Sequence, residues 1–166
     1  MLETERLRLR PFTHDDLDDA AAMFGDAETM RYYPRPFTRE ESLGWIDWNL
    51  RLYRERGYGL WVLELKETGE FAGDCGLIPQ QFDTTEETEI GYHVVRRLWR
   101  RGLASEAAAA CRDYARDTLG LDRVVSIIHP DNVPSQGVTR KVGMELDREI
   151  VRWGRTQLLF AMSLER

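Results

Sequence analysis

The chain has 166 residues and a net charge of −6, with 42% hydrophobic and 31% charged residues. This size and composition predict one globular domain over residues 1–166, without a disordered tract. The acidic balance, the charged N-terminus and the lack of a ~20-residue apolar run argue for a cytoplasmic protein that binds neither nucleic acid nor membrane.

Cysteine and histidine positions bear on metal binding and redox chemistry. Cys75 and Cys111 fit no metal-ligand spacing, and no two of His14, His93 and His129 have the spacing H-x-x-x-H. We therefore expect no metal site. A cytoplasmic protein keeps its thiols reduced, so the two cysteines are expected to be buried free thiols.

The N-terminal third predicts one strand and three helices. Leucines alternate with arginines before Pro11, as in a strand. Thr13 with Asp16, and Thr38 with Glu41, have the spacing of capping boxes that begin helices. The expected elements are a strand at 6–10 and helices at 13–24, 26–33 and 38–56.

Residues 60–78 predict a β-hairpin. The turn is Lys66–Gly69, with glycine placed for positive φ. Gly73 and Gly76 lie within the returning strand, where glycine often marks the close approach of another backbone or a ligand. A polar loop is expected to follow, from Pro79 to Glu87.

The next strand and the turn after it organise the chain. In ETEIGYHV, Ile90 and Tyr92 fall on one strand face, and Glu89 and His93 fall on the other. The strand leads into a basic turn, RRLWRRGLA, and then an alanine-rich helix. Such a turn directs backbone N–H groups and the positive helix end to one spot, which suits a phosphate.

The last third predicts two helices and three strands. Small residues on the inner face of the alanine-rich helix allow close packing on a sheet, and VVSII suits a strand covered on both faces. Asn132 is placed to cap a helix that ends at Gly143. The expected elements are helices at 103–119 and 132–143 and strands at 123–129, 144–152 and 157–164.

Five segments that span nearly the whole chain are TERLRLRPF, GDCGL, EIGYHV, WRRGLASEA and NVPSQGVTRKVGM. In this order they resemble the GNAT superfamily of acetyl-CoA-dependent N-acyltransferases, and most closely its RimJ/RimL-like branch. The resemblance implies an α/β fold with a mixed, mostly antiparallel central sheet of about seven strands flanked by about four helices. It implies that strands four and five splay apart and that coenzyme A occupies the gap.

The resemblance also implies a cofactor site. The pyrophosphate loop of the family, Q/R-x-x-G-x-G/A, corresponds to Trp99–Ala104, with Trp99 where glutamine or arginine is usual. The alternative is that the four arginines of this region, at positions 96, 97, 100 and 101, only coat a surface loop. The pantetheine arm is expected alongside Tyr92–Val94. The residues expected to bind acetyl-CoA are His93, Val94, Val95, Arg97, Arg100, Arg101, Gly102, Leu103, Ala104, Ser105 and Asn132.

Acyl transfer to an amine requires a base for the amine and a donor for the departing thiolate. Glu89 is the candidate base, directly or through a water, unless it is simply an exposed strand glutamate; His93 is the rival base. The family's acid, a tyrosine in the last helix, is replaced by Thr139, so Ser135 is the candidate substitute. Alternatively, Asn132 and Ser135 only cap their helix. The resemblance further implies that a backbone N–H near Val94 polarises the thioester carbonyl.

The expected function is acetyl transfer from acetyl-CoA to a primary amine by direct attack in a ternary complex. The acceptor is a peptide or protein N-terminus or a small molecule, and the resemblance allows a homodimer. Substrate choice is expected to depend on Tyr32–Phe37, the helix of Trp45 and Trp48, and the loop Pro79–Glu87. The alternative is a non-catalytic acyl-CoA-binding or regulatory module on the same fold.

Overall fold

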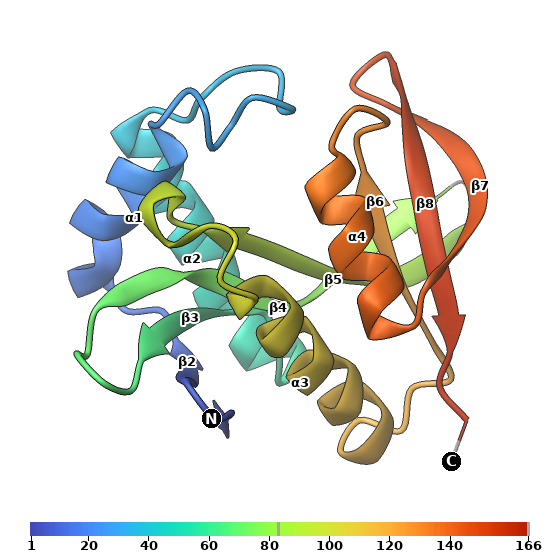
Figure 1. Ribbon diagram of the computed structural model, residues 1–166, viewed down its shortest axis with the longest axis horizontal. Helices are drawn as coiled ribbons and strands as arrows, with labels where there is room; N and C mark the ends of the chain where they lie inside the picture. Colours follow the sequence, from blue (N-terminus) through green and yellow to red (C-terminus); the bar gives the residue numbers. More distant parts are fainter. Residues whose placement is uncertain (83, 166) are drawn as a thin grey trace.

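One sheet runs through the part of the chain that the computed structural model describes, residues 1–82 and 84–165 (Figure 1). The strands are Leu2–Glu3 (β1), Leu7–Pro11 (β2), Leu60–Leu65 (β3), Phe71–Phe82 (β4), Thr85–Val94 (β5), Arg123–Ile128 (β6), Glu145–Arg152 (β7) and Arg155–Ser163 (β8). Their order in the sheet is β1-β2-β3-β4-β5-β6-β8-β7. Neighbours are antiparallel except β5 and β6, which run parallel.

Helices cover both faces of this sheet. The α-helices are Leu17–Phe24 (α1), Arg39–Arg56 (α2), Leu103–Asp117 (α3) and Val133–Val142 (α4), and short 3-10 helices cover His14–Asp16 (η1) and Arg96–Leu98 (η2). Helix α3 packs on β4 and β5, and α4 packs on α3 and β6. Helices α1 and α2 bury Phe24 and Ile46 against Leu60 and Val62 on the opposite face (Figure 1).

The predicted fold class is confirmed, with one additional strand. The short β1 was not expected, so the described sheet has eight strands rather than about seven. Strands β5 and β6 are the fourth and fifth of the predicted set. Their ladder consists of the single pair Glu89–Val125, supported by a 2.7 Å hydrogen bond from Ser126 Oγ to the carbonyl of Ile90. Beyond these contacts the strands diverge, as the resemblance implied.

Two local predictions are wrong. Residues 26–33 form successive turns rather than a helix. Arg31 and Tyr33 donate to carbonyls three residues back, and the prolines at 34 and 36 prevent the helix from continuing. The predicted loop at 79–87 is mostly hairpin: β4 continues to Phe82 and β5 begins at Thr85, while Asp83 lies outside the described residues. Gln80 pairs with Glu87 there, so polar side chains extend an exposed strand end.

Other local predictions are confirmed. Both capping boxes are formed, at Thr13 and Thr38. Gly57 and Gly143 end α2 and α4 in the left-handed conformation that favours glycine. At Gly73, φ is 144°, and a Cβ would collide with the carbonyl oxygen of His93. The glycine therefore allows β4 to approach β5 closely beside His93.

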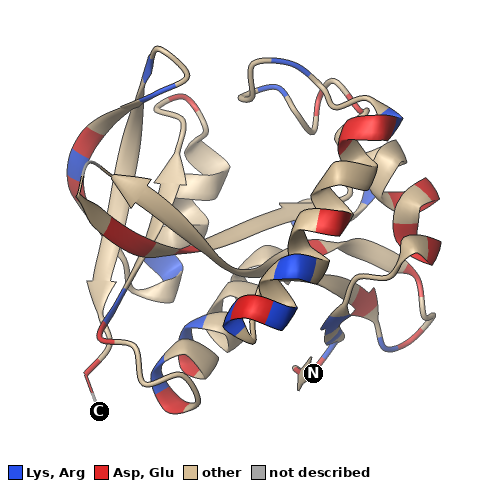
Figure 2. Cartoon of the chain, turned by 180° about the vertical axis from the view of Figure 1, so that it is seen from behind, with Lys and Arg blue, Asp and Glu red and all other residues tan. Residues whose placement is uncertain are grey.

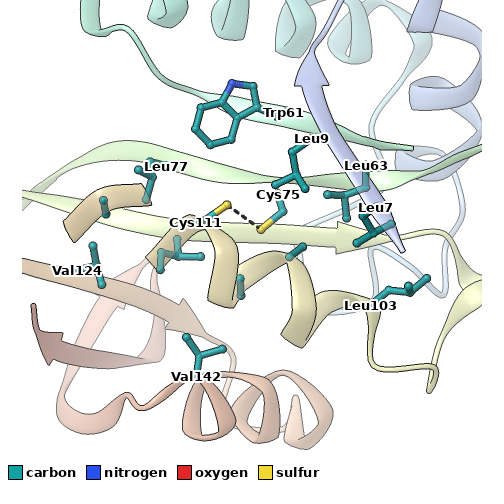
Figure 3. Packing of buried hydrophobic residues seen from close by; sticks show 14 of the residues in the cluster. Leu7, Leu9, Trp61, Leu63, Cys75, Leu77, Leu103, Cys111, Val124 and Val142 are labelled. Carbon is teal, nitrogen blue, oxygen red and sulfur yellow. Dashed lines mark hydrogen bonds between the residues drawn. The ribbon is translucent and has the colours of Figure 1, made fainter. Parts of the chain in front are cut away.

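The larger hydrophobic cluster lies between α3 and the sheet and contains both cysteines (Figure 3). Cys75 of β4 and Cys111 of α3 are buried free thiols with their sulfur atoms 3.6 Å apart. Burial raises the pKa of the Cys75 thiol, which makes it a poor nucleophile. The prediction of buried thiols is confirmed.

Acidic and basic positions are mixed along the helices on the far side of the molecule (Figure 2). Charged residues also form ion pairs between elements, such as Arg56 of α2 with Glu86 of β5 and Asp16 of η1 with Arg10 of β2. Within the described residues, no helix combines the length and the hydropathy that crossing a membrane requires.

Candidate active site

A cavity of about 870 Å³ lies where β5 and β6 diverge. This volume is in the range of small-molecule and cofactor sites. Its walls come from the 28–37 segment, β5, the start of α3, the start of α4 and the β7–β8 hairpin. Segments distant in the sequence therefore meet around one space, with the loop before α3 at one end.

The loop before α3 exposes backbone N–H groups to the cavity. Arg100 and Gly102 adopt left-handed φ values of 64° and 77°, a conformation found in main-chain anion sites, and Gly102 to Ser105 line the cavity. Gly102 is the N-cap of α3 and supplies no side-chain hydrogen bond, so the first N–H groups of the helix lack a side-chain cap. This geometry fits a pyrophosphate, because free N–H groups and the positive helix end face the same space.

Contacts from outside the cavity hold this loop in place. Arg6 donates from Nη1 to the carbonyl of Arg101 at 2.8 Å and from Nε to Glu106 at 2.9 Å. Thr4 donates to the same glutamate at 2.5 Å. On the other side, Trp99 donates from Nε1 to the carbonyl of Val94 at 2.7 Å. Trp99, which stands where the family motif has glutamine or arginine, therefore attaches the loop to the end of β5.

The structure brings most of the predicted cofactor residues together. The predicted residues that line the cavity are His93, Val94, Arg100, Gly102, Leu103, Ala104, Ser105 and Asn132. Three others do not line it. Val95 packs between the two main hydrophobic clusters, the carbonyl of Arg101 accepts from Arg6, and Arg97 points to Glu70, 3.9 Å away. Lys141, which was not among the predicted residues, also lines the cavity.

Glu89 is the buried carboxylate of the cavity. Its side chain faces the α1–α2 side of β5, and only 6% of the residue is exposed, so it is not a solvent-exposed strand glutamate. Gln80 donates to Oε2 at 2.6 Å. Burial raises the pKa of Glu89, while the positive charge of Arg152 and hydrogen bonds from Gln80 and the Ile127 backbone oppose that rise.

His93 is part of a hydrogen-bonded chain of side chains. Its Nδ1 lies 2.7 Å from Oδ1 of the fully buried Asp74, whose Oδ2 accepts from Trp45 Nε1 at 3.1 Å. Its Nε2 lies 2.6 Å from the hydroxyl of Tyr33. An ionised Asp74 accepts only, so His93 carries a proton on Nδ1; in the neutral imidazole, Nε2 is then the acceptor for the Tyr33 hydroxyl. Burial raises the pKa of Tyr33, which keeps its hydroxyl protonated.

The opposite wall of the cavity contains the residues of α4. Asn132 caps the helix, accepting from the N–H of Ser135 at 3.3 Å, and both residues line the cavity. Tyr92 donates to the carbonyl of Ser135 at 2.9 Å and so connects β5 to α4. Thr139 donates within its own helix to Gln136, which leaves Ser135 as the hydroxyl of α4 at the cavity.

Sequence reasoning missed several residues of the site. Asp74 could have been found, because an acid between glycines in an otherwise apolar strand requires a buried partner. The β7–β8 hairpin contributes Arg152, Trp153 and Gln157, and no local motif marks them. Of the segments expected to select substrate, 32–37 and Trp45 reach the cavity, whereas 79–82 and 84–87 do not line it.

Comparison with known proteins identifies the family. A family model described as "Acetyltransferase (GNAT) domain" matches residues 6–145. The uncharacterized protein YkkB of Bacillus subtilis is 39% identical over 93% of this chain and 90% of its own. An acetyltransferase structure from Agrobacterium tumefaciens has a TM-score of 0.84 and 29% identity, over 97% of this chain and 92% of that one.

The chain belongs to the GNAT acetyltransferase family, and it is an acetyltransferase whose acyl donor, as in the rest of the family, is acetyl-CoA. The fold is also that of Mycobacterium smegmatis RimJ, solved in complex with CoA-disulfide. That structure has a TM-score of 0.75 and 20% identity, over 95% of this chain and 85% of its own. The family assignment made from the sequence is confirmed, and the fold is shared with RimJ.

Proposed function

We propose that the protein moves an acetyl group from acetyl-CoA to a primary amine by direct attack in a ternary complex. The acceptor is a small-molecule amine or a peptide N-terminus. One observation carries this proposal: a single cavity contains both an anion-binding loop at the start of α3 and a buried carboxylate, Glu89. The first suits the cofactor pyrophosphate, and the second can take a proton from the acceptor.

Glu89 is the proposed base. A protonated amine cannot attack a carbonyl, so the acceptor must first lose a proton. A carboxylate whose pKa is raised by burial is a better proton acceptor than one in water. Arg152 and Gln80 keep the ionised form accessible in a buried position. Glu89 acts directly or through a water, as its position on the cavity wall allows.

His93 is the less favourable base, because both of its ring nitrogens already have partners. Nδ1 bonds to Asp74 and Nε2 accepts from Tyr33. A proton could reach the imidazole only through the Tyr33 hydroxyl. We assign Tyr33 and His93 a positioning role: with its proton directed to His93, the Tyr33 oxygen offers a lone pair to an acceptor N–H.

The backbone N–H near Val94 and the hydroxyl of Ser135 complete the proposed machinery. Val94 and Ser135 line the cavity from facing walls, and Tyr92 connects those walls. Such donors would stabilise the charge that develops on the acyl oxygen and on the departing sulfur.

Thiol release from acetyl-CoA in the presence of pooled amines tests the function. Wild-type protein should release thiol with at least one class among peptides, polyamines and amino acids. Glu89→Gln should lower kcat roughly 100-fold, the range of general-base catalysis, with acetyl-CoA affinity unchanged in calorimetry. Glu87→Gln, on the same strand and paired with Arg123, is the matched control. Tight acetyl-CoA binding without turnover would instead show that the protein is a non-catalytic acyl-CoA-binding or regulatory module.

A further inference from the structure

The β7–β8 hairpin presents polar groups to the acceptor end of the cavity. Ile150 pairs with Gln157 across the hairpin, and Arg152 lies two residues beyond Ile150 on the same strand. Because side chains alternate along a strand, Arg152 and Gln157 share one face. Both line the cavity, and the proposed base Glu89 lines it from β5.

Gln157 is an unpaired buried donor. Only 3% of the residue is exposed, and its Nε2 has no hydrogen-bond partner among the described residues. Buried polar groups in folded proteins are nearly always paired, since leaving one unpaired is costly. The amide lies on the cavity wall, so an oxygen of a bound ligand would complete its hydrogen bonding.

Arg152 brings a positive charge to the same place. Within the described part of the chain, no carboxylate oxygen lies within 4 Å of its guanidinium, which instead stands 4.4 Å from the centre of the Trp153 ring. Its charge opposes the rise that burial causes in the pKa of both Glu89 and Tyr33. The guanidinium is therefore close enough to the proposed base to act on its charge.

We propose that Arg152 and Gln157 bind a carboxylate of the acceptor, so that the substrate is a free amino acid or a similar small amino carboxylate. This inference rests on the proposed function. A guanidinium and an amide N–H are the donors that suit a carboxylate, and a guanidinium can hold it with two parallel bonds. The amino group then lies at Glu89. The first residue of a peptide has no α-carboxylate, because that group forms the peptide bond.

The walls around this position are aromatic. Tyr33, Phe37 and Trp45 line the cavity, and the Tyr33 ring lies 5.5 Å from that of Trp153. These rings give the side chain of the acceptor an apolar surface. Amino acids with apolar or aromatic side chains are therefore the first to test.

The experiment compares acceptors that differ only at the carboxylate. Acetylation rates are measured for L-phenylalanine, L-phenylalaninamide and phenethylamine, and for the corresponding leucine and methionine series. Binding of each compound to the CoA-saturated protein is measured by calorimetry. We expect the free acids to exceed the amides by at least about tenfold in kcat/KM and in affinity, the discrimination of a site built to bind that group. Amides have the more easily deprotonated amines, so intrinsic reactivity opposes this order.

Two variants locate the contact. Arg152→Gln and Gln157→Leu should raise KM and Kd for the acids and bring the acids and amides close to parity. Arg148→Gln, on the same strand but exposed and paired with Asp147, should leave the preference unchanged. Loss of the preference in Arg148→Gln as well would contradict the assignment.

The remaining outcomes separate the two proposals. If amides and simple amines react as well as the acids, the carboxylate site is wrong and amine acetylation stands. If acids bind selectively through Arg152 but nothing is acetylated, the carboxylate site stands and the proposed function fails. If no acid binds more tightly than its amide, the inference is overturned whatever the turnover.

Discussion

His93 Nδ1 lies 2.7 Å from Asp74 Oδ1 in a setting where the histidine side chain is 9% exposed and the aspartate is fully buried. A chemically similar pair, His14 Nε2 and Asp47 Oδ1, has the same 2.7 Å separation at the surface, with both side chains more than half exposed. The two pairs share their groups and their distance and differ in burial. Comparing variants of the two pairs therefore separates the effect of burial on stability from the effect of the contact itself.

Asp74→Asn should destabilise the protein by about 1–3 kcal/mol, because an amide has one oxygen for the two donors that Asp74 satisfies, Trp45 and His93. Asp47→Asn should change the free energy of unfolding by less than about 1 kcal/mol, as for exposed pairs. Denaturant unfolding of both variants checks this. Equal effects of the two substitutions would show that burial of Asp74 contributes nothing.

Tyr33→Phe should lower kcat/KM for the amine about tenfold, since it removes one oriented hydrogen bond to the acceptor. Acetyl-CoA affinity should stay constant, because the hydroxyl contacts His93 rather than the loop before α3. Tyr114→Phe is the control, because Tyr114 packs on Trp61 and does not line the cavity. Steady-state kinetics over a pH series distinguishes the roles. A base acting through Tyr33 would lose the acidic limb in Tyr33→Phe, whereas a positioning residue would keep it.

Glu89→Gln should make the protein relatively more stable as the pH rises. Burial raises the folded-state pKa of Glu89, so folding favours its protonated form. That favourable contribution is complete below the unfolded-state pKa and is lost as the pH rises through the folded-state pKa. Glutamine does not ionise and avoids this loss. The unfolding free energy of Glu89→Gln minus that of wild type should be more positive at pH 8 than at pH 4. A difference that does not change with pH would contradict the burial effect.

Gly102→Asp should abolish acetyl-CoA binding, because it places a carboxylate at the N-terminus of α3 where phosphate is expected. Position 102 also has a φ of 77°, so Gly102→Ala reports the backbone strain alone. Gly57→Asp introduces the same residue at a similar φ of 76° at the end of α2, outside the cavity. Calorimetry should show lost binding only for Gly102→Asp, with at most a modest loss in Gly102→Ala. Unchanged affinity in Gly102→Asp would refute the loop assignment.

Local sequence signals located most of the elements and the loop before α3 that carries the predicted pyrophosphate motif. The Thr38–Glu41 capping box, the alternation through Ile90 and Tyr92 and the glycine at position 102 each act within a few residues. Their geometry is therefore encoded where it occurs. The same reasoning failed for residues 26–33, where the segment ends in turns three residues long immediately before Pro34.

The acceptor end could not be predicted in the same way, because its groups come from distant parts of the chain. Tyr33 and His93 are 60 residues apart, and Gln157 belongs to a hairpin whose residues carry no motif. Burial of Glu89 also depends on packing, since alternation places it on a strand face without showing what covers that face. These relationships arise only when the sheet closes around the cavity.

The contact between β5 and β6 is a short bridge between two half-sheets, one pairing long on the main chain. A cofactor bound beside this pair would contact both strands across the gap, where the strands do not pair with each other. By mass action, a ligand at about 100 times its Kd adds roughly 2.7 kcal/mol to the stability of the state that binds it. The free energy of unfolding of this protein should therefore rise with the fraction of molecules that have cofactor bound.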